Sequence, residues 1–276
     1  MFVPLVNHED HDWRAGAGEA KWLVVDGRSN VLLVDDAVPL AMQAPLMAET
    51  VHLLGLDGTT AVWAVDAADV VFDDDLLMPD GARWVGLRQL YGAIDETDWV
   101  LAGRAAQVVT WDRDHRFCGR CGQPTTAHWR DRARECRRCR LLAYPRLNPA
   151  VIMLVERDDG RALLAWGRQF PGRFFSALAG FVEPGESLEE AVAREVEEEV
   201  GITIDDIRYF GSQPWPFPHS MMIGFTARYR SGDLVYQEEE IVEAGWYTPD
   251  DLPPVPRGGM SIAGWMIEDW INRVGG

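Results

Sequence analysis

Short apolar runs separated by turn-forming residues dominate the first third of the chain. The runs 22–25 and 31–34 flank 26–30, and the runs 51–56 and 61–65 flank 57–60. Each pair predicts a β-hairpin, the second with an Asp-Gly turn signal. Apolar residues at helical spacing predict a helix over about 95–111. We therefore expect a small α/β domain over 1–112.

The last part of the chain carries the strongest hydrophobic pattern. The runs 150–155 and 161–166 predict two buried strands joined by an Asp-Asp-Gly turn, and further strands are expected at 221–229 and 245–247. A helix is expected to close the chain at 262–274. Short strands with few long helices favour an α+β fold over a doubly wound sheet. The 276 residues are expected to form three domains, over 1–112, 113–147 and 148–276.

One amphipathic helix is predicted between Gly180 and Ile202. Ser187 and Glu190 have the spacing of a capping box, and Gly201 is a good helix stop. At 100° per residue, the apolar side of this helix consists of Leu188, Val192, Val196 and Val200. This side predicts how the helix is turned toward the core.

The same helix gathers three carboxylates beside its apolar side. Glu195, Glu198 and Glu199 lie three and four residues apart, and Arg194 can hold the carboxylate of Glu198. Clustered carboxylates repel one another unless a cation lies among them. Hard oxygen ligands at this density suit Mg²⁺ or Mn²⁺, which can clamp a pyrophosphate and activate a water molecule. The alternative is a solvated acidic helix, against which the flanking glycines, the embedded arginine and the spacing argue.

All four cysteines fall within 22 residues in the middle of the chain. Cys118 and Cys121 form one C-x2-C pair, and Cys136 and Cys139 form a second pair fourteen residues later. Four thiolates on two turns match one structural Zn²⁺ per chain, with no coordination position left for water. Free thiols or a redox pair are the alternative. A single mid-chain cluster is unlike a disulfide scaffold, so we expect a reducing cytoplasm.

Charge is unevenly distributed. The chain has 26 basic and 44 acidic residues and a formal net charge of −18, which excludes a nucleic-acid coat over the whole surface. Between Arg113 and Arg146, however, ten arginines face three acidic residues. Two interpretations of these arginines stay open: a solvated face, or a surface that touches polyphosphate or RNA.

No apolar run approaches the length of a membrane helix. A helix needs roughly 20 apolar residues to span a bilayer. Residues 1–10 lack a basic start and a long apolar stretch, so we expect no signal peptide.

Aromatic residues and prolines alternate over 212–220. Three prolines at alternate positions fix φ and predict a stiff, extended loop. Such a loop can present Trp215 and Phe217 as stacking plates, with hydrogen-bonding groups from Ser212, Gln213 and Ser220. Flat rings beside adaptable polar groups suit a nicotinamide or adenine. A purely structural proline-rich loop is the alternative.

The segment from Gly180 to Ile202 resembles the Nudix box, G-x5-E-x7-R-E-U-x-E-E-x-G-U with U a bulky aliphatic residue. Nudix hydrolases cleave nucleoside diphosphates linked to another group. The resemblance implies an α/β/α sandwich over 148–276, with the box as loop, helix and loop. It also implies that Glu195, Glu198 and Glu199 bind metal and act in catalysis, with Glu186 in support.

The segment 212–220 further resembles the S-Q-P-W-P-F-P-x-S signature of the NADH pyrophosphatase branch of this family, which shares the order N-terminal domain, zinc ribbon, Nudix domain. The branch implies hydrolysis of NADH and NAD⁺ to nicotinamide mononucleotide and AMP, removal of NAD caps from RNA 5′ ends, and a homodimer with composite sites. The substrate-contacting residues implied are Arg88, Tyr144, Phe181, Ser212, Gln213, Pro214, Trp215, Pro216, Phe217, Pro218, His219, Ser220 and Ala263. Phe181 and Trp215 would sandwich the nicotinamide ring, and Asp131 stands where relatives can have a glutamate.

The same resemblance implies two further metal ligands, the backbone carbonyl of Ala179 and the carboxylate of Glu240. It leaves the general base open between Glu198 and Glu199. Two other functions compete with NAD(H) hydrolysis. The aromatic segment argues against a Nudix hydrolase for ADP-ribose or a nucleotide sugar. The intact carboxylate set and the net charge of −18 argue against a non-catalytic, nucleotide-sensing regulator.

Overall fold

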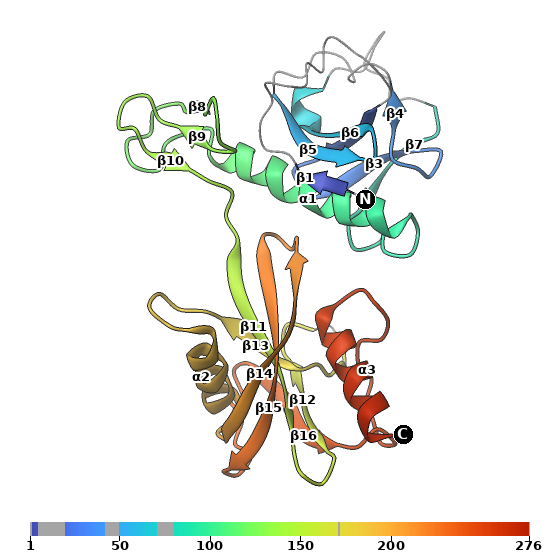
Figure 1. Cartoon of the computed structure of the whole chain (residues 1–276), viewed down its shortest axis with the longest axis vertical. Coiled ribbons are helices and arrows are strands. Elements are labelled where there is room, and N and C mark those ends of the chain that lie inside the picture. Colours follow the sequence, from blue (N-terminus) through green and yellow to red (C-terminus); the bar gives the residue numbers. More distant parts are fainter. Residues whose placement is uncertain (1, 5–19, 42–49, 71–79, 171, 276) are drawn as a thin grey trace. The chain divides into compact units, whose positions relative to one another are not determined.

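The computed structural model describes residues 2–4, 20–41, 50–70, 80–170 and 172–275. Within it the chain divides into two compact units, Met1–Arg146 and Leu147–Gly276 (Figure 1). The three domains expected from the sequence stay a prediction, and the boundary expected at 112 falls inside a helix. In the described part of the chain, none of the helices combines the length and apolar composition needed to cross a bilayer. Most of the segment examined for a signal peptide, 5–10, lies outside the described residues.

The first unit contains a mixed sheet and one long helix. Its elements are β1 (Phe2–Pro4), β2 (Ala20–Val25), β3 (Asn30–Val34), β4 (Leu40–Ala41), β5 (Val51–Asp57), β6 (Thr60–Asp66), the 3₁₀-helix η1 (Ala67–Asp69), β7 (Ala82–Gly86) and α1 (Glu96–Asp114). The strands run in the order β1-β5-β6-β2-β3-β7, and β4 pairs with β2. Both predicted hairpins are confirmed as the antiparallel pairs β2–β3 and β5–β6. The predicted helix is confirmed as α1, which begins after the N-cap Asp95.

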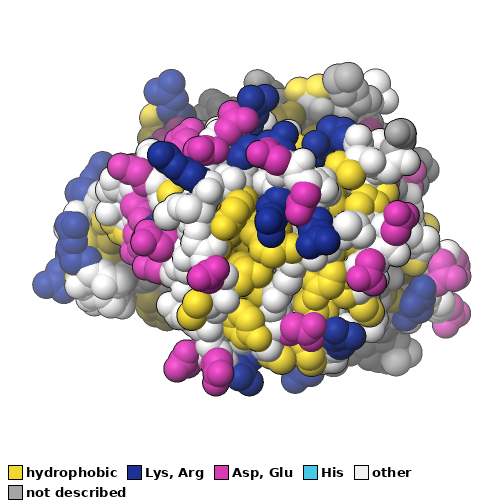
Figure 2. All heavy atoms as spheres, turned by 90° about the horizontal axis from the view of Figure 1, so that it is seen from below, with side chains coloured by type: hydrophobic (Ala, Val, Ile, Leu, Met, Phe, Trp, Pro, Cys, Tyr) yellow, Lys and Arg dark blue, Asp and Glu magenta, His cyan; other side chains and the backbone are white. Residues whose placement is uncertain are grey.

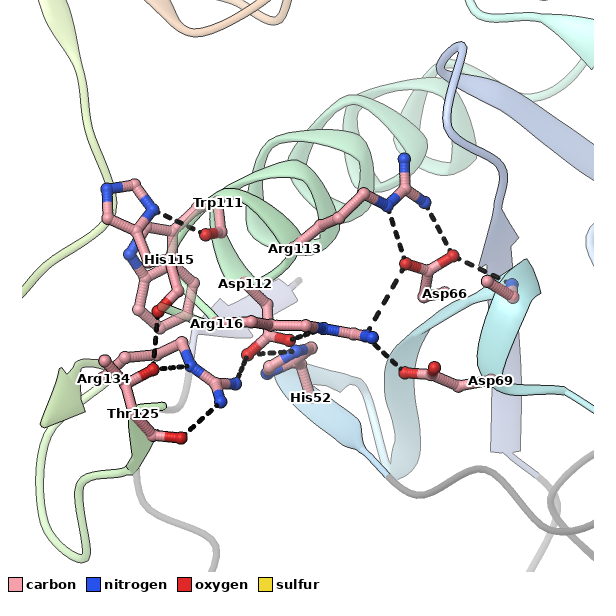
Figure 3. Close-up of polar contacts among 11 residues, drawn as sticks. His52, Asp66, Asp69, Trp111, Asp112, Arg113, His115, Arg116, Thr125 and Arg134 are labelled. Atoms are coloured by element: carbon pink, nitrogen blue, oxygen red, sulfur yellow. Dashed lines mark hydrogen bonds and ion pairs between the residues drawn. The ribbon is translucent and has the colours of Figure 1, made fainter. Parts of the chain in front are cut away.

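A small three-stranded sheet follows α1 in the same unit. Its strands are β8 (Thr126–Ala127), β9 (Arg134–Glu135) and β10 (Leu142–Ala143), in the order β10-β9-β8. Arg134 is buried and donates from Nη1 to Asp112 Oδ1 of α1 at 2.6 Å and from Nη2 to the Thr125 carbonyl at 3.0 Å (Figure 3). This cysteine-bearing segment, called the ribbon below, is therefore tied to α1 by buried charge.

The second unit is a sheet covered by a helix on each face (Figure 1). Its elements are β11 (Asn148–Glu156), β12 (Ala162–Gly167), β13 (Leu178–Phe181), α2 (Leu188–Val200), β14 (Thr203–Trp215), β15 (Ser220–Ser231), β16 (Ile241–Tyr247) and α3 (Ile262–Val274). The strand order is β14-β15-β11-β12-β16, and β13 pairs with β11. This arrangement confirms the expected α/β/α sandwich.

The central strand β11 shows why both helices are needed. Val151, Met153 and Val155 pack with the apolar side of α2, and Ile152 and Leu154 pack with α3. Alternate residues of a strand face opposite sides of the sheet, so an uninterrupted apolar run requires cover on both faces. The run 150–155 therefore predicts a strand buried on both sides.

The expectation of an extended loop over 212–220 is wrong. β14 continues to Trp215, β15 begins at Ser220, and 216–219 form the turn of a hairpin. β14 was not expected from its sequence because its polar, glycine-bearing pattern lacks clear alternation. It lies at the edge of the sheet, where exposed side chains and Pro214 are tolerated.

Candidate active site and metal centre

Helix α2 is held at both ends by the residues that the sequence indicated. Ser187 Oγ accepts a hydrogen bond from the Glu190 amide at 3.3 Å, and Glu190 Oε2 accepts one from the Ser187 amide at 2.7 Å. Gly201 takes the left-handed conformation at φ 73° and donates to the Glu197 carbonyl. The predicted capping box and helix stop are confirmed, and together with the buried valines they determine where the glutamates point.

Gly180 on β13 makes room for Glu195. A Cβ atom at position 180 would lie 1.9 Å from Cδ of Glu195, closer than any two such atoms can approach. The carboxylate of Glu195 thus lies against the backbone of β13, and the first glycine of the box is a steric requirement of this contact.

Arg194 is the centre of a hydrogen-bond network at the solvent side of α2. It donates to both carboxylate oxygens of Glu186, at 2.5 and 3.0 Å, and from Nη1 to Glu195 and Glu198 at 2.9 Å each. Its Nη2 also donates to the Phe181 carbonyl at 2.9 Å. The bond from Arg194 holds the pKa of Glu186 at about 2. The predicted Arg194–Glu198 contact is confirmed, and Glu186 supports the site through Arg194.

Glu199 is the most isolated carboxylate of the group. Its residue is 8% exposed, and its Oε2 is buried and accepts no hydrogen bond from any described residue. Burial, with the negative charges of Glu195 and Glu240, raises the pKa of Glu199 to about 8. Burial also raises the pKa of Glu195. A buried acceptor with no partner among other carboxylates fits a divalent cation, which would neutralise the repulsion.

A short turn brings Glu240 toward this helix. The Gln237 amide donates to the Glu199 carbonyl at 3.1 Å, and the Arg168 amide donates to the Glu240 carbonyl at 2.8 Å. Arg168 Nε also donates to the Glu238 carbonyl. The turn is therefore fixed to α2 on one side and to the end of β12 on the other.

These elements enclose a pocket of about 370 Å³. It is lined by Arg168, Gln169, Ala179, Glu199, Glu239, Glu240 and Ile241. Three of the metal ligands implied by the resemblance, Ala179, Glu199 and Glu240, thus share one pocket. Arg168 and Gln169 were missed, because they follow β12 in no motif and reach the site only through strand pairing.

The glutamates do not form a closed ligand cage. In the part of the chain that the structure describes, the four cysteines are the only group of three or more His, Cys, Asp or Glu side chains whose ligand atoms all lie within 4.8 Å of one another. Glu198 remains 55% exposed, while Glu199 is buried. Of the glutamates predicted to bind metal, Glu199 and Glu240 line the pocket, and Glu195 and Glu198 lie on the same helix as Glu199.

The aromatic segment 212–220 lies on the paired ends of β14 and β15 and on the turn between them, next to the start of α3. The rings of Trp215 and Phe217 contact each other edge to face, with centroids 5.0 Å apart and an angle of 68°. Gln213 is 6% exposed. Its side-chain Nε2 donates to the Met260 carbonyl at 3.0 Å, and its Oε1 accepts from the Ile262 backbone amide at 2.7 Å. Gln213 thus fixes the N-terminus of α3, directly before Ala263.

The remaining predicted substrate residues differ in accessibility. Phe181, the second residue of the box, is 55% exposed, whereas Ser220 is buried. Tyr144 and Arg88 belong to the first unit, where the Tyr144 hydroxyl donates to Asp131 Oδ2 at 3.3 Å. Their contacts with a substrate stay a prediction.

The four cysteine sulfurs form the second candidate metal centre. The Sγ distances are 3.4 Å for Cys118–Cys139, 3.5 Å for Cys121–Cys136 and 3.9 Å for Cys121–Cys139. Four thiolates in a tetrahedron at about 2.3 Å from Zn²⁺ stand about 3.8 Å apart, whereas disulfide sulfurs stand about 2.05 Å apart. The cluster fits a tetrahedral metal ion.

The two cysteine turns have the same backbone design. The Cys118 amide donates to the Gln123 carbonyl and the Gly122 amide to the Cys118 carbonyl, each at 2.8 Å. In the second turn, the Cys136 amide donates to Leu141 at 3.0 Å and the Arg140 amide to Cys136 at 2.8 Å. The repeated pattern gives both turns the same shape, and the four sulfurs that they carry lie around one centre.

Comparison with known proteins agrees with both halves of this structure. The Nudix domain model matches residues 146–266, and a model described as an NADH pyrophosphatase-like rudimentary Nudix domain matches residues 4–111. The N-terminal match agrees with the domain order that the resemblance implied, although the hairpins of 1–112 carry no motif of their own.

Several curated relatives are similar over most of their length. The NAD-capped RNA hydrolase NudC of Pseudomonas entomophila (strain L48) is 50% identical over 194 residues, 70% of this chain and 69% of that protein. The protein of the same name from Stutzerimonas stutzeri (strain A1501) is 43% identical over 261 residues, 91% of this chain and 90% of that protein. A crystal structure of a Nudix hydrolase from Nitrosomonas europaea aligns with 50% of this chain and 80% of its own, with a TM-score of 0.43 and 23% identity. On its domain matches and these relatives, the chain belongs to the Nudix hydrolase family, in the branch that joins a Nudix domain to an NADH pyrophosphatase-like N-terminal domain.

Proposed function

We propose that this protein hydrolyses the pyrophosphate of NADH and NAD⁺ to nicotinamide mononucleotide and AMP, and removes NAD caps from RNA 5′ ends. The observation that carries the proposal is the buried Oε2 of Glu199, which accepts no hydrogen bond from any residue the structure describes, in a pocket shared with Glu240 and Ala179. The names of the curated relatives support the choice of substrate.

The residues of helix α2 and of the neighbouring pocket have different roles in the proposed reaction. Glu195, Glu199, Glu240 and the Ala179 carbonyl would hold Mg²⁺ or Mn²⁺, which when bound activates water and neutralises charge on phosphate oxygens. Arg194 keeps Glu195 and Glu198 in place through the bonds described above. Either Glu198 or Glu199 accepts the proton of the attacking water.

Substrate selection is assigned to aromatic and polar groups around this pocket. Phe181 and Trp215 stack against the nicotinamide ring, and Gln213 positions the helix start that carries Ala263. Tyr144 and Arg88 contribute from the first unit, within a homodimer. One Zn²⁺ per chain stabilises the ribbon, and the protein works in the cytoplasm.

A product assay tests the proposal. The purified protein is incubated with Mg²⁺ or Mn²⁺ and equal amounts of NADH, NAD⁺, ADP-ribose and an NAD-capped RNA, alongside Glu199→Gln. We expect nicotinamide mononucleotide from the nicotinamide substrates, and none with the variant. Preference for ADP-ribose would identify another Nudix specificity. Tight nucleotide binding without cleavage would identify a sensor.

A further inference from the structure

The ten arginines of the ribbon segment fall into two groups. Arg113, Arg116 and Arg134 turn inward and pair with Asp66, Asp69 and Asp112 at 2.6 Å each. Arg132 donates from Nη2 to the Leu53 carbonyl at 2.7 Å. These four arginines are structural. The open question therefore concerns the exposed ones.

Four exposed arginines lie on the two cysteine turns, 118–122 and 136–140, which we call the ribbon tip. They are Arg120, Arg137, Arg138 and Arg140. Because both turns hold the same sulfur cluster, the four exposed arginines belong to one small part of the ribbon. The acidic neighbour on β9, Glu135, pairs with Arg140 at 3.1 Å. The thiolates lie inside the tip and the arginines outside, so an approaching polyanion meets positive charge first.

Arg140 occupies a backbone position that favours glycine. It has φ 57°, and its counterpart in the first turn is Gly122 with φ 70°. Non-glycine residues rarely adopt this left-handed conformation, because their Cβ atom is crowded there. The second turn thus keeps a long cationic side chain where a glycine would be less strained.

An aromatic pocket adjoins the tip within the same unit. Phe117, directly before the first turn, is 66% exposed, and it lines a pocket of about 310 Å³ together with Gly119, Tyr144 and Arg146. Exposed rings beside guanidinium groups are the combination with which proteins bind single-stranded nucleic acids, through stacked bases and paired phosphates. The face in Figure 2 differs, because acidic and basic side chains are interspersed there.

We propose that the ribbon tip and the Phe117 pocket bind the single-stranded RNA that continues beyond the NAD cap. This inference rests on the proposed function. The tip arginines would contact phosphates, and Phe117 would stack on an unpaired base. Tyr144, which is predicted to contact the capped nucleotide, lines the same pocket as Phe117. The chain as a whole has a net charge of −18, so the cationic tip is the part of the surface that favours an RNA strand.

The test compares two double charge reversals of the full-length, zinc-loaded protein. Arg137→Glu/Arg138→Glu changes the tip, and Arg228→Glu/Arg230→Glu makes the same change in charge at exposed positions on β15. We measure kcat/KM for NAD⁺ and for a single-stranded NAD-capped RNA. We also measure, in the Glu199→Gln background, the affinity for a 5′-monophosphate RNA at several salt concentrations.

The tip variant is expected to lose about tenfold in kcat/KM on the capped RNA and in RNA affinity, relative to the β15 variant. Its kcat/KM on NAD⁺ should be unchanged. Losing two phosphate contacts should reduce the slope of log affinity against log salt by about 1.4, at 0.7 for each contact with a single strand. Phe117→Ala should weaken RNA binding without changing this slope.

Equal RNA binding by the two charge-reversal variants would overturn the proposal and favour an acidic protein as the partner of the tip. An equal loss on NAD⁺ and RNA with zinc retained would also overturn it. If the tip variant loses zinc, Arg137→Gln/Arg138→Gln repeats the test without charge reversal. Cleavage of NAD⁺ but not of capped RNA by the unaltered protein would contradict cap removal alone, and affinity for the 5′-monophosphate RNA would still decide the role of the tip.

Discussion

Both units bury carboxylates, yet the two groups are neutralised differently. In the first unit, Asp66 accepts hydrogen bonds from Arg113 at 2.6 and 2.9 Å, and Asp112 accepts one from Arg134 at 2.6 Å (Figure 3). Burial alone would raise the pKa of Asp66, but the bonds from Arg113 and the Ala68 amide bring it below its usual value. The chain itself supplies the positive charge.

In the second unit, no basic side chain neutralises the buried carboxyl group of Glu199 among the residues that the structure describes. Glu199 is as buried as the aspartates of the first unit, but it faces Glu195 and Glu240 and its pKa is raised to about 8. Paired carboxylates of the first kind fasten elements together, whereas an unpaired group of the second kind costs stability unless a ligand completes it. The contrast separates structural acids from functional ones, although the residue types are similar.

The largest expected effect is the loss of activity when one carboxylate of the unpaired glutamate group is removed. Glu199→Gln should lower kcat/KM on NAD⁺ by at least about a thousandfold, or about 4 kcal/mol, because a metal ligand is lost. Glu197→Gln, at an exposed position of the same helix, is the control and should retain activity. Near-normal turnover by the Glu199 variant would refute the assignment of this carboxylate to the metal site.

The glutamate group was largely predictable because it depends on local rules. The phase of α2 follows from its apolar side and its caps, and these determine which glutamates share a face. Gly180 was part of the recognised box, but its steric reason, the closeness of Glu195, appears only when β13 is placed beside α2.

What the sequence did not reveal depends on pairing between distant segments. Arg168 reaches Glu238 across seventy residues, and Gln213 reaches Ile262 across forty-nine. Neither stands in a pattern that marks such a partner. The turn at 216–219 was misjudged because proline stiffness was considered without the strand pairing on both sides.

The next largest expected effect is the loss of stability when one carboxylate of the paired aspartate group is removed. Asp112→Asn should destabilise the first unit by about 3 kcal/mol, because it leaves the buried Arg134 without its carboxylate. The same type of change at Glu199 should have the opposite sign, and stabilise magnesium-free protein by about 1 kcal/mol at neutral pH, since it removes a buried carboxyl whose raised pKa costs folding free energy. Calorimetry of both variants with zinc retained measures the two shifts. If both variants were destabilised by a similar amount, the aspartates of the first unit and the glutamates of the second would not differ in how they affect stability.

Adding a divalent cation tests the difference between the unpaired glutamates and the paired aspartates without removing any contact within the protein. Mg²⁺ or Mn²⁺ at about a hundred times its Kd should stabilise the second unit by about 2.7 kcal/mol. The shift should disappear in Glu199→Gln and persist in Asp112→Asn, because only the first change removes a ligand of the ion. Thermal unfolding with and without the cation provides the measurement. A shift that survives in Glu199→Gln would locate the ion elsewhere.

The smallest effect concerns acid stability of the first unit. Because the folded pKa of Asp66 lies below its unfolded value, its contribution to stability is fully present above about pH 4 and is lost as the pH falls through the folded pKa. Asp66→Asn lacks this titration, so its deficit in unfolding free energy should shrink as the pH falls below about 4. Urea unfolding of the two proteins across that range measures the difference. A deficit that stays constant would mean that the Asp66 side chain acts through its shape and hydrogen bonds, and that its charge adds nothing to the paired group.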